Sequence, residues 1–266
     1  MKHIIHALCL FAGCVPLLAG PIVTTTNLLL NPGAEAGSLT NWTAGGVSNP
    51  KVDSGSFDPG INPHSGTNDF LGGVGTAGSL AQVVSLVGNQ GLSAVAIDGG
   101  GLLARVSFWE QSYNQSPADG AYISLAFLGG NSNVISIVAT LEVASAASFT
   151  WSNSVVYFMI PAGTRYLQYT MNFVRHNGSD LDAFVDDNSL IVFDASLLPQ
   201  LNIVLTGAAA RIFWPTNFAD GFTLQQNTNL ATTNWVTSGY AITNGFGTNF
   251  CTITPPLGNL FFRLKQ

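Results

Sequence analysis

The sequence predicts an all-β chain, with a sandwich or barrel of about eight strands followed by a smaller second β module. Short runs of β-branched and aromatic residues alternate with polar residues from Ile22 to Phe193, and Gly, Asn, Ser and Pro clusters separate them. The sequence contains no stretch with a sustained helical period and caps. Apolar residues make up 47% of the 266 residues, so the chain can bury a sizeable core.

The candidate strands of the first region follow one another at intervals typical of a sandwich. They are Ile22 to Leu30, Ser79 to Leu86, Leu103 to Ser112, Ala121 to Leu128, Val134 to Glu142, Ser148 to Phe158, Arg165 to Arg175 and Ala183 to Phe193. The long stretch from Gly33 to Gly78 has few strand formers and is predicted to be a loop. It either wraps the sandwich and supports a ligand or metal, or is a mobile surface loop.

Residues 194–200 are predicted to be a linker, and residues 201–266 a small second β module. Its candidate strands are Leu201 to Leu205, Ala209 to Trp214, Phe222 to Gln225, Phe250 to Thr254 and Leu260 to Leu264.

The charge content indicates an extracellular type of surface and excludes nucleic-acid binding. Charged residues make up only 8% of the chain, against about 25% in a typical soluble domain, so Asn, Ser, Thr, Gln and Gly must keep the surface hydrated. The formal net charge is −6. The few Lys and Arg residues are scattered along the sequence, whereas phosphate binding needs them clustered.

The first 19 residues are predicted to be a signal peptide, because a short basic start precedes an apolar run and small residues near Ala19. In an alternative interpretation, the run before Cys14 is a lipoprotein signal and Cys14 carries a lipid anchor. The apolar run is too short, and too interrupted, to be a membrane span. After cleavage only Cys251 would remain, so we expect a secreted or cell-surface protein without an internal disulfide.

Both ends of the first region resemble one known family. The segment from Asn27 to Glu35, with Trp42 shortly after, is similar to the opening strand and turn of galactose-binding-like jelly rolls, including CenC-type carbohydrate-binding modules. The segment from Ala183 to Leu190 is similar to their closing strand, and motifs at 71–73, 81–84 and 105–109 fit between the two ends. The resemblance covers about residues 25–193. It implies a jelly-roll β-sandwich over residues 22–193 and binding of a polysaccharide or other glycan.

The second module also has a resemblance. Its apolar and aromatic motifs, from Leu201 to the final Phe261-Phe262-Arg263-Leu264, are similar to a short C-terminal β module of secreted proteins of environmental bacteria. No catalytic role is associated with that module. The resemblance implies a small sandwich-like fold without an active site.

Asp186 is the residue that links the resemblance to physical chemistry. Alternation along a strand would put Phe184, Asp186, Leu190 and Val192 on one apolar face, and a buried carboxylate must be protonated, hydrogen-bonded or bound to metal. The resemblance implies a structural calcium ion held by Glu35 and Asp186, with Asp187 as the alternative because it would point the other way. Alternatively, these acids cap loop amides without metal.

The same alternation predicts a sugar-binding face. It turns Trp109, Gln111 and Tyr113 away from the core, and likewise Tyr122, Gln168 and Asn172. Aromatic rings beside amides and hydroxyls are suited to sugars, because rings stack on C–H faces and polar groups bind hydroxyls. Alternatively, Trp109 and Tyr113 are covered by the C-terminal module or by the long loop.

The sequence does not indicate an enzyme. After leader removal only His64 and His176 remain, without a metalloprotease motif or a nucleophile elbow. Among candidate acids for glycoside hydrolysis, Glu110 is the first to test, although we expect it to pair with Arg105 or Arg175 instead. The predicted function is therefore a secreted, non-catalytic carbohydrate-binding protein. The alternatives are a structural or adhesive cell-surface protein and, less favoured, a polysaccharide lyase or hydrolase.

Overall fold

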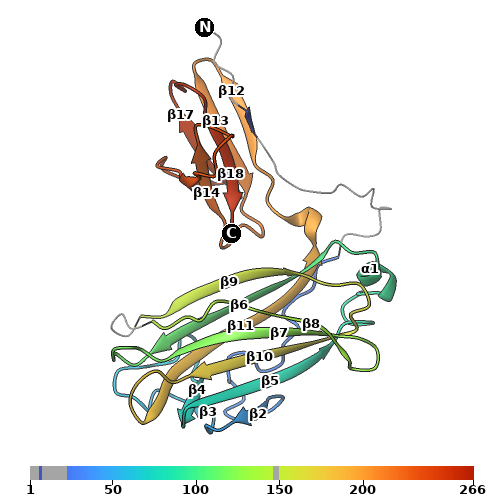
Figure 1. The fold of residues 1–266 in the computed structure, drawn as a ribbon, viewed down its shortest axis with the longest axis vertical. Coiled ribbons are helices and arrows are strands. Elements are labelled where there is room, and N and C mark those ends of the chain that lie inside the picture. Colours follow the sequence, from blue (N-terminus) through green and yellow to red (C-terminus); the bar gives the residue numbers. More distant parts are fainter. Residues whose placement is uncertain (1–5, 8–22, 146–149) are drawn as a thin grey trace. The chain divides into compact units, whose positions relative to one another are not determined.

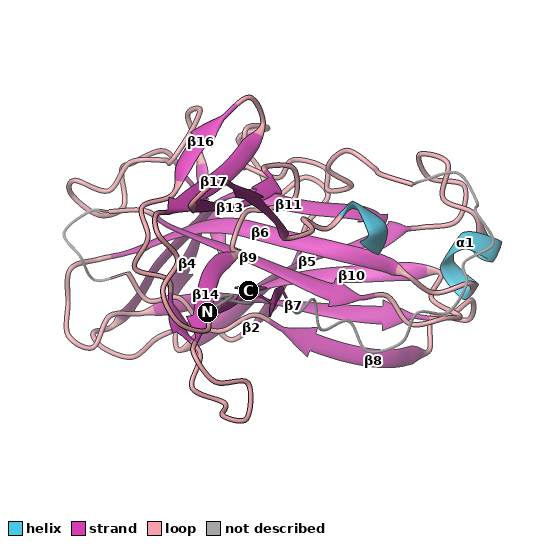
Figure 2. Ribbon diagram, turned by 90° about the horizontal axis from the view of Figure 1, so that it is seen from above, coloured by secondary structure: helices cyan, strands magenta, loops and turns pink. Residues whose placement is uncertain are grey.

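A computed structural model describes residues 6–7, 23–145 and 150–266. It confirms the all-β class: strands are the main regular structure of the described chain, and within it helix is limited to α1 (Ala94–Asp98) and the short 3-10 helix η1 (Ala195–Leu197) (Figure 2). Most of the predicted signal peptide, including Cys14, lies outside the described residues. Within the described part, no helix combines the length and apolar character needed to cross a membrane.

The chain forms two compact units, the first ending at Ala195 and the second beginning at Ser196 (Figure 1). The first unit contains two five-stranded sheets. The front sheet has the strand order β2 (Thr43–Gly46), β5 (Ala77–Ser85), β10 (Tyr166–Val174), β7 (Gly120–Leu128) and β8 (Val134–Ala139). The back sheet has the order β3 (Lys51–Asp53), β4 (Asp69–Val74), β11 (Asp180–Asp194), β6 (Leu102–Ser112) and β9 (Ser152–Met159).

Most consecutive strands from β4 to β11 alternate between the two sheets, which is the jelly-roll arrangement. The two sheets enclose one large core, because alternate residues of each strand point inward. On β10 these are Leu167, Tyr169, Met171 and Phe173, all at most 1% exposed. On β7, Ile123, Leu125 and Phe127 likewise point inward and are fully buried.

Two predictions about the first 78 residues are wrong. The stretch 33–78 is not a continuous loop, because it contains β2, β3 and β4. The sequence signal is weak there because these strands are short or rich in glycine; at Gly72 of β4, any side chain would clash with Leu181. The described part of the predicted strand 22–30 is not a regular strand. It joins β11 through an isolated bridge from Thr24 to Phe193 and a few further hydrogen bonds.

The second unit is a small pair of four-stranded sheets. One has the order β12 (Asn202–Thr206), β13 (Ala209–Pro215), β17 (Thr248–Ile253) and β16 (Thr243–Gly245). The other has the order β1 (His6–Ala7), β18 (Phe261–Lys265), β14 (Thr223–Asn227) and β15 (Val236–Thr237). Ile212 and Trp214 of the first sheet share one core with Leu224 and Phe262 of the second, so this unit is sandwich-like.

Candidate functional site

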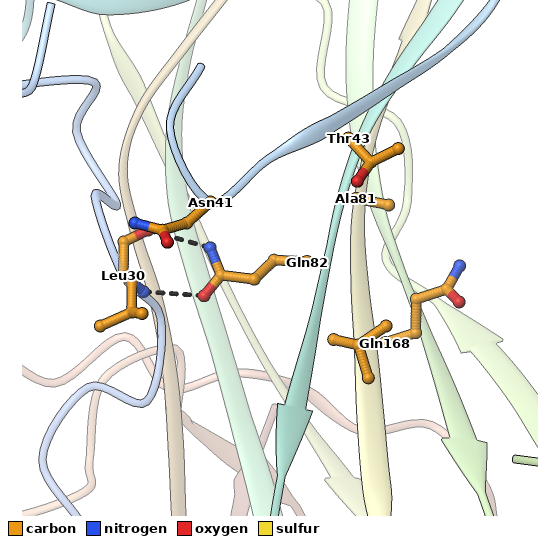
Figure 3. A pocket seen from close by; sticks show the side chains of 7 residues that line it. Leu30, Asn41, Thr43, Ala81, Gln82 and Gln168 are labelled. Carbon is orange, nitrogen blue, oxygen red and sulfur yellow. Dashed lines mark hydrogen bonds between the residues drawn. The ribbon is translucent and has the colours of Figure 1, made fainter. Parts of the chain in front are cut away.

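A hollow of about 510 Å³ opens at the front sheet, where β2, β5 and β10 lie side by side. It is lined by Leu30, Asn41, Thr43, Ala81, Gln82, Val83 and Gln168 (Figure 3). The wall is fixed by a reciprocal pair of hydrogen bonds. The Leu30 N–H donates to Gln82 Oε1 over 2.8 Å, and Gln82 Nε2 donates to the Leu30 carbonyl over 2.9 Å. The hollow is therefore held open by main-chain and amide groups that are already satisfied.

Three of the six predicted sugar-binding residues share the outer surface of the front sheet. Asn172 of β10 pairs with Tyr122 of β7, and Gln168 lies four residues earlier on β10, on the same side. The Asn172 amide donates to Ser124 Oγ over 3.0 Å and to the Tyr122 carbonyl over 3.4 Å. Gln168 lines the hollow. The structure thus places Tyr122, Gln168 and Asn172 on one surface, with Gln168 at the hollow and the Tyr122–Asn172 pair further along the same strands.

The five strands of the front sheet contain no Asp, Glu, Lys, Arg or His. Its outward side chains are amides, hydroxyls, tyrosines and small or aliphatic groups. Such a surface offers hydrogen bonds and ring faces to a neutral, hydroxyl-rich ligand, but no charge to attract an ionic one.

Trp109, Gln111 and Tyr113 do not belong to this surface. Trp109 and Gln111 lie on β6 of the back sheet, and Tyr113 follows the end of that strand. The prediction of one shared face was therefore wrong, because alternation along a strand shows which residues point out but not to which sheet the strand belongs.

The loop between β3 and β4, residues 54–68, is the part of the stretch 33–78 that we call the long loop. It covers these back-sheet residues, as the alternative interpretation proposed. The His64 ring stacks on Trp109 with 3.9 Å between centroids and an 18° interplanar angle. Gln111 is only 1% exposed. Tyr113 packs against a small apolar cluster that includes Ile61 from the loop. One face of Trp109 is thus already occupied by a ring of the protein itself.

The three predicted calcium ligands converge on one segment, residues 64–68. The Glu35 carboxylate accepts from the backbone N–H groups of Thr67 and Asn68, at 3.1 and 3.0 Å. Asp186 Oδ2 accepts from the Ser65 N–H at 3.0 Å. These are the contacts expected if the acids cap loop amides, and they bring the carboxylates of Glu35 and Asp186 to the same loop.

Asp187 joins the same loop because a β-bulge changes the direction of β11. The register between β11 and β6 shifts between Asp186 and Ser189, and Asp187 has a φ of 48°. Asp187 Oδ2 is 2.7 Å from His64 Nδ1, and its Oδ1 accepts from Ser65 Oγ at 2.7 Å. The expectation that Asp187 points away from the Asp186 site was wrong for this reason.

The bulge also changes which residues of β11 face the main core, so Asp186 does not point into that core, contrary to the prediction. Ala183 and Val185 face the main core, as do Leu190 and Val192, so the inward set changes parity across the bulge. Phe184 instead joins the small cluster beneath the long loop. Asp186 is fully buried, but on the loop side of the back sheet rather than in the main core. Desolvation raises its pKa to about 6, against the lowering effect of the Ser65 and Asp187 N–H groups.

Asp69 is a fourth acid at this place, and the sequence motifs did not indicate it. It is fully buried at the start of β4, and neither carboxylate oxygen has a hydrogen-bond partner within the described chain. Burial, followed by repulsion from Asp53, Asp186 and Glu35, raises its pKa to about 8. The sequence signal that could have indicated a buried acid is the position of Asp69 directly before the apolar pair Phe70-Leu71.

The donor types at this place suit a hard divalent cation, although their spacing does not form a ready-made site. A carboxylate that is buried, unpartnered and close to other carboxylates needs either a proton or a cation, and calcium prefers carboxylate and carbonyl oxygens. In the arrangement that the structure gives residues 23–145 and 150–266, no group of three or more His, Cys, Asp or Glu side chains is spaced to hold a metal ion. The fit therefore rests on Asp69 and its acidic neighbours.

Glu110 is not accessible to a substrate. It is fully buried, and its carboxyl contacts Ser112 Oγ at 2.5 Å and the Ser145 N–H at 3.0 Å. Desolvation raises its pKa to about 8, although both contacts act in the opposite direction. The expected ion pair is wrong for Arg175, which donates to the Ser179 carbonyl. The acid that sequence reasoning placed first for hydrolysis is therefore an internal group.

Comparison with known proteins gives structural matches only. No family model matches the chain, and no curated protein matches it. Among solved structures, the chain is similar to TmCBM61 in complex with β-1,4-galactotriose, at 24% identity and a TM-score of 0.44, covering 62% of this chain and 98% of that one. It is similar to a family 16 carbohydrate-binding module, at 16% identity and a TM-score of 0.44, over 62% and 99% of the two chains.

A third match is the CBM22-1 xylan-binding domain of Xyn10C from Paenibacillus barcinonensis, at 13% identity and a TM-score of 0.38, covering 66% of this chain and 96% of that one. These three structures are carbohydrate-binding modules, the class that the sequence motifs resemble. At such TM-scores the likeness identifies no ligand for this chain.

Proposed function

We propose that this chain is a secreted, non-catalytic carbohydrate-binding protein whose binding surface is the outer side of the front sheet, and that its ligand is an uncharged glycan. The single observation that carries the proposal is the absence of any charged residue or histidine from the five strands of the front sheet. Its 510 Å³ hollow lies within the range of small-ligand sites.

The proposal assigns roles by chemistry. Tyr122 would offer a ring face to the C–H groups of a sugar, while Gln168 would offer an amide beside the hollow. Asn172 is already bonded to Ser124 and the Tyr122 carbonyl, so it would hold this surface in shape as well as contact hydroxyls. The back-sheet residues Trp109 and Gln111 have no part in this surface.

The test measures binding of soluble polysaccharides by isothermal titration calorimetry. Galactan, xylan and mixed-linkage glucan serve as uncharged probes, and polygalacturonate serves as the charged one. Tyr122→Ala and Gln168→Ala should each weaken the binding of an uncharged probe by roughly tenfold or more, which corresponds to about 1.4 kcal/mol. Trp109→Ala is the matched control, because it removes a large ring from the other sheet, and it should leave affinity unchanged.

Other results would point to other functions. Equal affinity of all three variants would refute the front surface as the site, and preference for polygalacturonate would refute the uncharged ligand. Failure to bind any probe would favour the structural or adhesive alternative. Release of reducing sugar from a bound polysaccharide would make the chain an enzyme.

We also propose that a structural calcium ion is held by Glu35, Asp69 and Asp186. The support is the buried Asp69 carboxylate without a partner, next to two other acids that approach the same loop. When bound, calcium would supply the positive charge that lets these carboxylates stay ionised while buried. Asp187 is left out, because its Oδ2 lies 2.7 Å from His64 Nδ1, a partner that can itself carry a positive charge. Within the described chain, Glu35 and Asp186 instead accept only from backbone and hydroxyl groups.

The calcium proposal has a direct test in thermal unfolding. A chelator should lower the melting temperature, and Asp186→Ala should shrink that loss. The exposed acid Asp98, which pairs with Arg165, provides the control: Asp98→Ala should leave the chelator effect as it is in the natural chain. Unchanged melting in the presence of chelator would refute the site.

A further inference from the structure

A second group of buried polar side chains lies on the loop side of the back sheet, further along β11. Asp182 of β11 is 8% exposed and Gln111 of β6 is 1% exposed. The strand register places them one step apart on this side, because Gln111 pairs with Phe184 and the Tyr113 N–H bonds to the Asp182 carbonyl. They are neighbours beneath the long loop.

Asp58 reaches the same place from the loop above. It lies between Phe57 and Ile61, and both of these pack on the small cluster around Phe184. Asp58 is among the acids whose negative charge raises the pKa of Asp182, to about 7, although desolvation is the larger cause. Desolvation and nearby acids also raise the pKa of Asp58 to about 6, and Lys51 lowers it in part.

These side chains have unused hydrogen-bonding capacity. Within the described chain, both amide atoms of Gln111, Oδ1 of Asp182 and Oδ2 of Asp58 are buried and have no hydrogen-bond partner. A buried polar atom without a hydrogen-bond partner destabilises the folded state. Three of the four atoms are oxygens, and they come from three different elements on the loop side of the back sheet, which indicates a missing cation rather than a single local defect. Gln111 is an observation independent of the acids. A buried acid can avoid an unpaired charge by taking up a proton, whereas a buried amide without partners has no such alternative.

We infer that Asp58, Asp182 and Gln111 form a second divalent-cation site, separate from the Glu35, Asp69 and Asp186 site. Two carboxylates and an amide oxygen are hard donors, and backbone carbonyls or water would complete the six to eight oxygens that calcium takes. The ion would clip the loop that carries Asp58 onto the strands beneath it. This inference does not depend on glycan binding.

The experiment counts bound calcium. Equilibrium dialysis of the full chain against calcium alone, at pH 8.5 where these carboxylates release their protons readily, should give about two ions per chain. Asp182→Asn should remove one of them and leave the other. Asp186→Asn should remove the other, and the double variant should bind neither. Asp98→Asn, which removes an exposed acid outside both groups, should still bind two.

A second variant protects the test against misfolding of Asp182→Asn. Gln111→Leu places an apolar side chain next to Phe184, so the fold should persist, and it should weaken one of the two ions at least tenfold. One ion in the natural chain that disappears with Asp186→Asn and survives both Asp182→Asn and Gln111→Leu would overturn the second site and leave the first standing. No bound calcium at all would overturn both.

Discussion

Replacing Glu110 by glutamine should make the protein more stable in alkaline solution. Glu110 is fully buried between the two sheets of the first unit, where its carboxyl group contacts Ser112 Oγ and the Ser145 N–H. Burial of a carboxylate without a positive partner disfavours its ionised form. Glutamine has the same shape and no charge to lose.

The hydrogen bonds around Ser112 Oγ also require a protonated Glu110. Ser112 Oγ lies 2.5 Å from Glu110 Oε1 and 2.5 Å from the carbonyl oxygen of Asp119. A hydroxyl has one proton to donate, so it can serve both oxygens only if Glu110 is protonated and donates to it. In Glu110→Gln the amide Nε2 would donate to Ser112, and the amide oxygen would still accept from the Ser145 N–H.

The magnitude follows from the pKa. Desolvation raises the pKa of Glu110 from an ordinary 4.5 to about 8. Between these values the unfolded chain has released the proton and the folded protein still holds it, so stability falls as pH rises, by about 1.4 kcal/mol for each pH unit. The full penalty above pH 8 is on the order of 5 kcal/mol by this conversion. It is absent below about pH 4.5, where both states are protonated.

The assay is urea unfolding of both proteins at pH 5, 6, 7, 8 and 9. Other titrating groups act equally in the two proteins, so the difference in unfolding free energy isolates Glu110. That difference should move in favour of Glu110→Gln as pH rises to about 8 and then level off. A difference that stays constant from pH 5 to 9 would refute this expectation, as would a difference that moves in favour of the natural chain as pH rises.

Three smaller predictions concern backbone and packing. Gly66→Ala should destabilise the protein by at least about 1–2 kcal/mol, because Gly66 has a φ of 62° and its new Cβ would clash with the Glu35 carboxyl. The control Gly88→Ala, at a positive φ with open space around it, should cost less stability. Equal losses in the two variants would contradict the clash. Tyr169→Phe should cost about 1–3 kcal/mol in urea unfolding, since it removes a buried hydroxyl that donates to Asn188 Oδ1; an unchanged midpoint would argue against that bond. The buried thiol of Cys251 on β17, whose pKa is raised by desolvation, should react with a thiol reagent only on unfolding. Rapid labelling of Cys251 in the folded protein would disprove its burial.

The sequence predicted the long strands of the first unit because alternation is strong where one side packs on a core. On β10, Leu167 to Phe173 alternates buried and half-buried residues throughout. The sequence did not predict the strands between residues 33 and 78. Strands such as β2, with the sequence TAGG, have too few large side chains to show an alternation of apolar and polar residues. Their pairing is fixed by neighbouring strands, and that information is not local.

The candidate site shows the same division between local and long-range information. Glu35 and Asp186 could be chosen from motifs, and the structure brings both to residues 64–68. The orientation of Asp187 could not be predicted, because one extra residue in a bulge reverses every later side chain on β11. The separation of Trp109 from Tyr122 could not be predicted either, because it depends on which sheet each strand joins.

The two sheets of the first unit differ in charge, and this difference unites the proposals. The front sheet strands have no acid, whereas eight of the chain's 14 acidic residues follow one another along the loop side of the back sheet. These eight are Glu35, Asp53, Asp58, Asp69, Asp180, Asp182, Asp186 and Asp187. Such a series is costly without cations, because neighbouring ionised carboxylates repel one another.

The turn between Leu30 and Glu35 connects the two sides. Leu30 fixes the wall of the hollow through Gln82, and Glu35 holds the loop at Thr67. Asn31 stiffens the turn between them, since its side-chain oxygen accepts from the Ala36 N–H and its carbonyl accepts from Trp42 Nε1. A cation bound at Glu35 would therefore stabilise the same short segment that shapes the uncharged surface, while adding no charge to the front sheet itself.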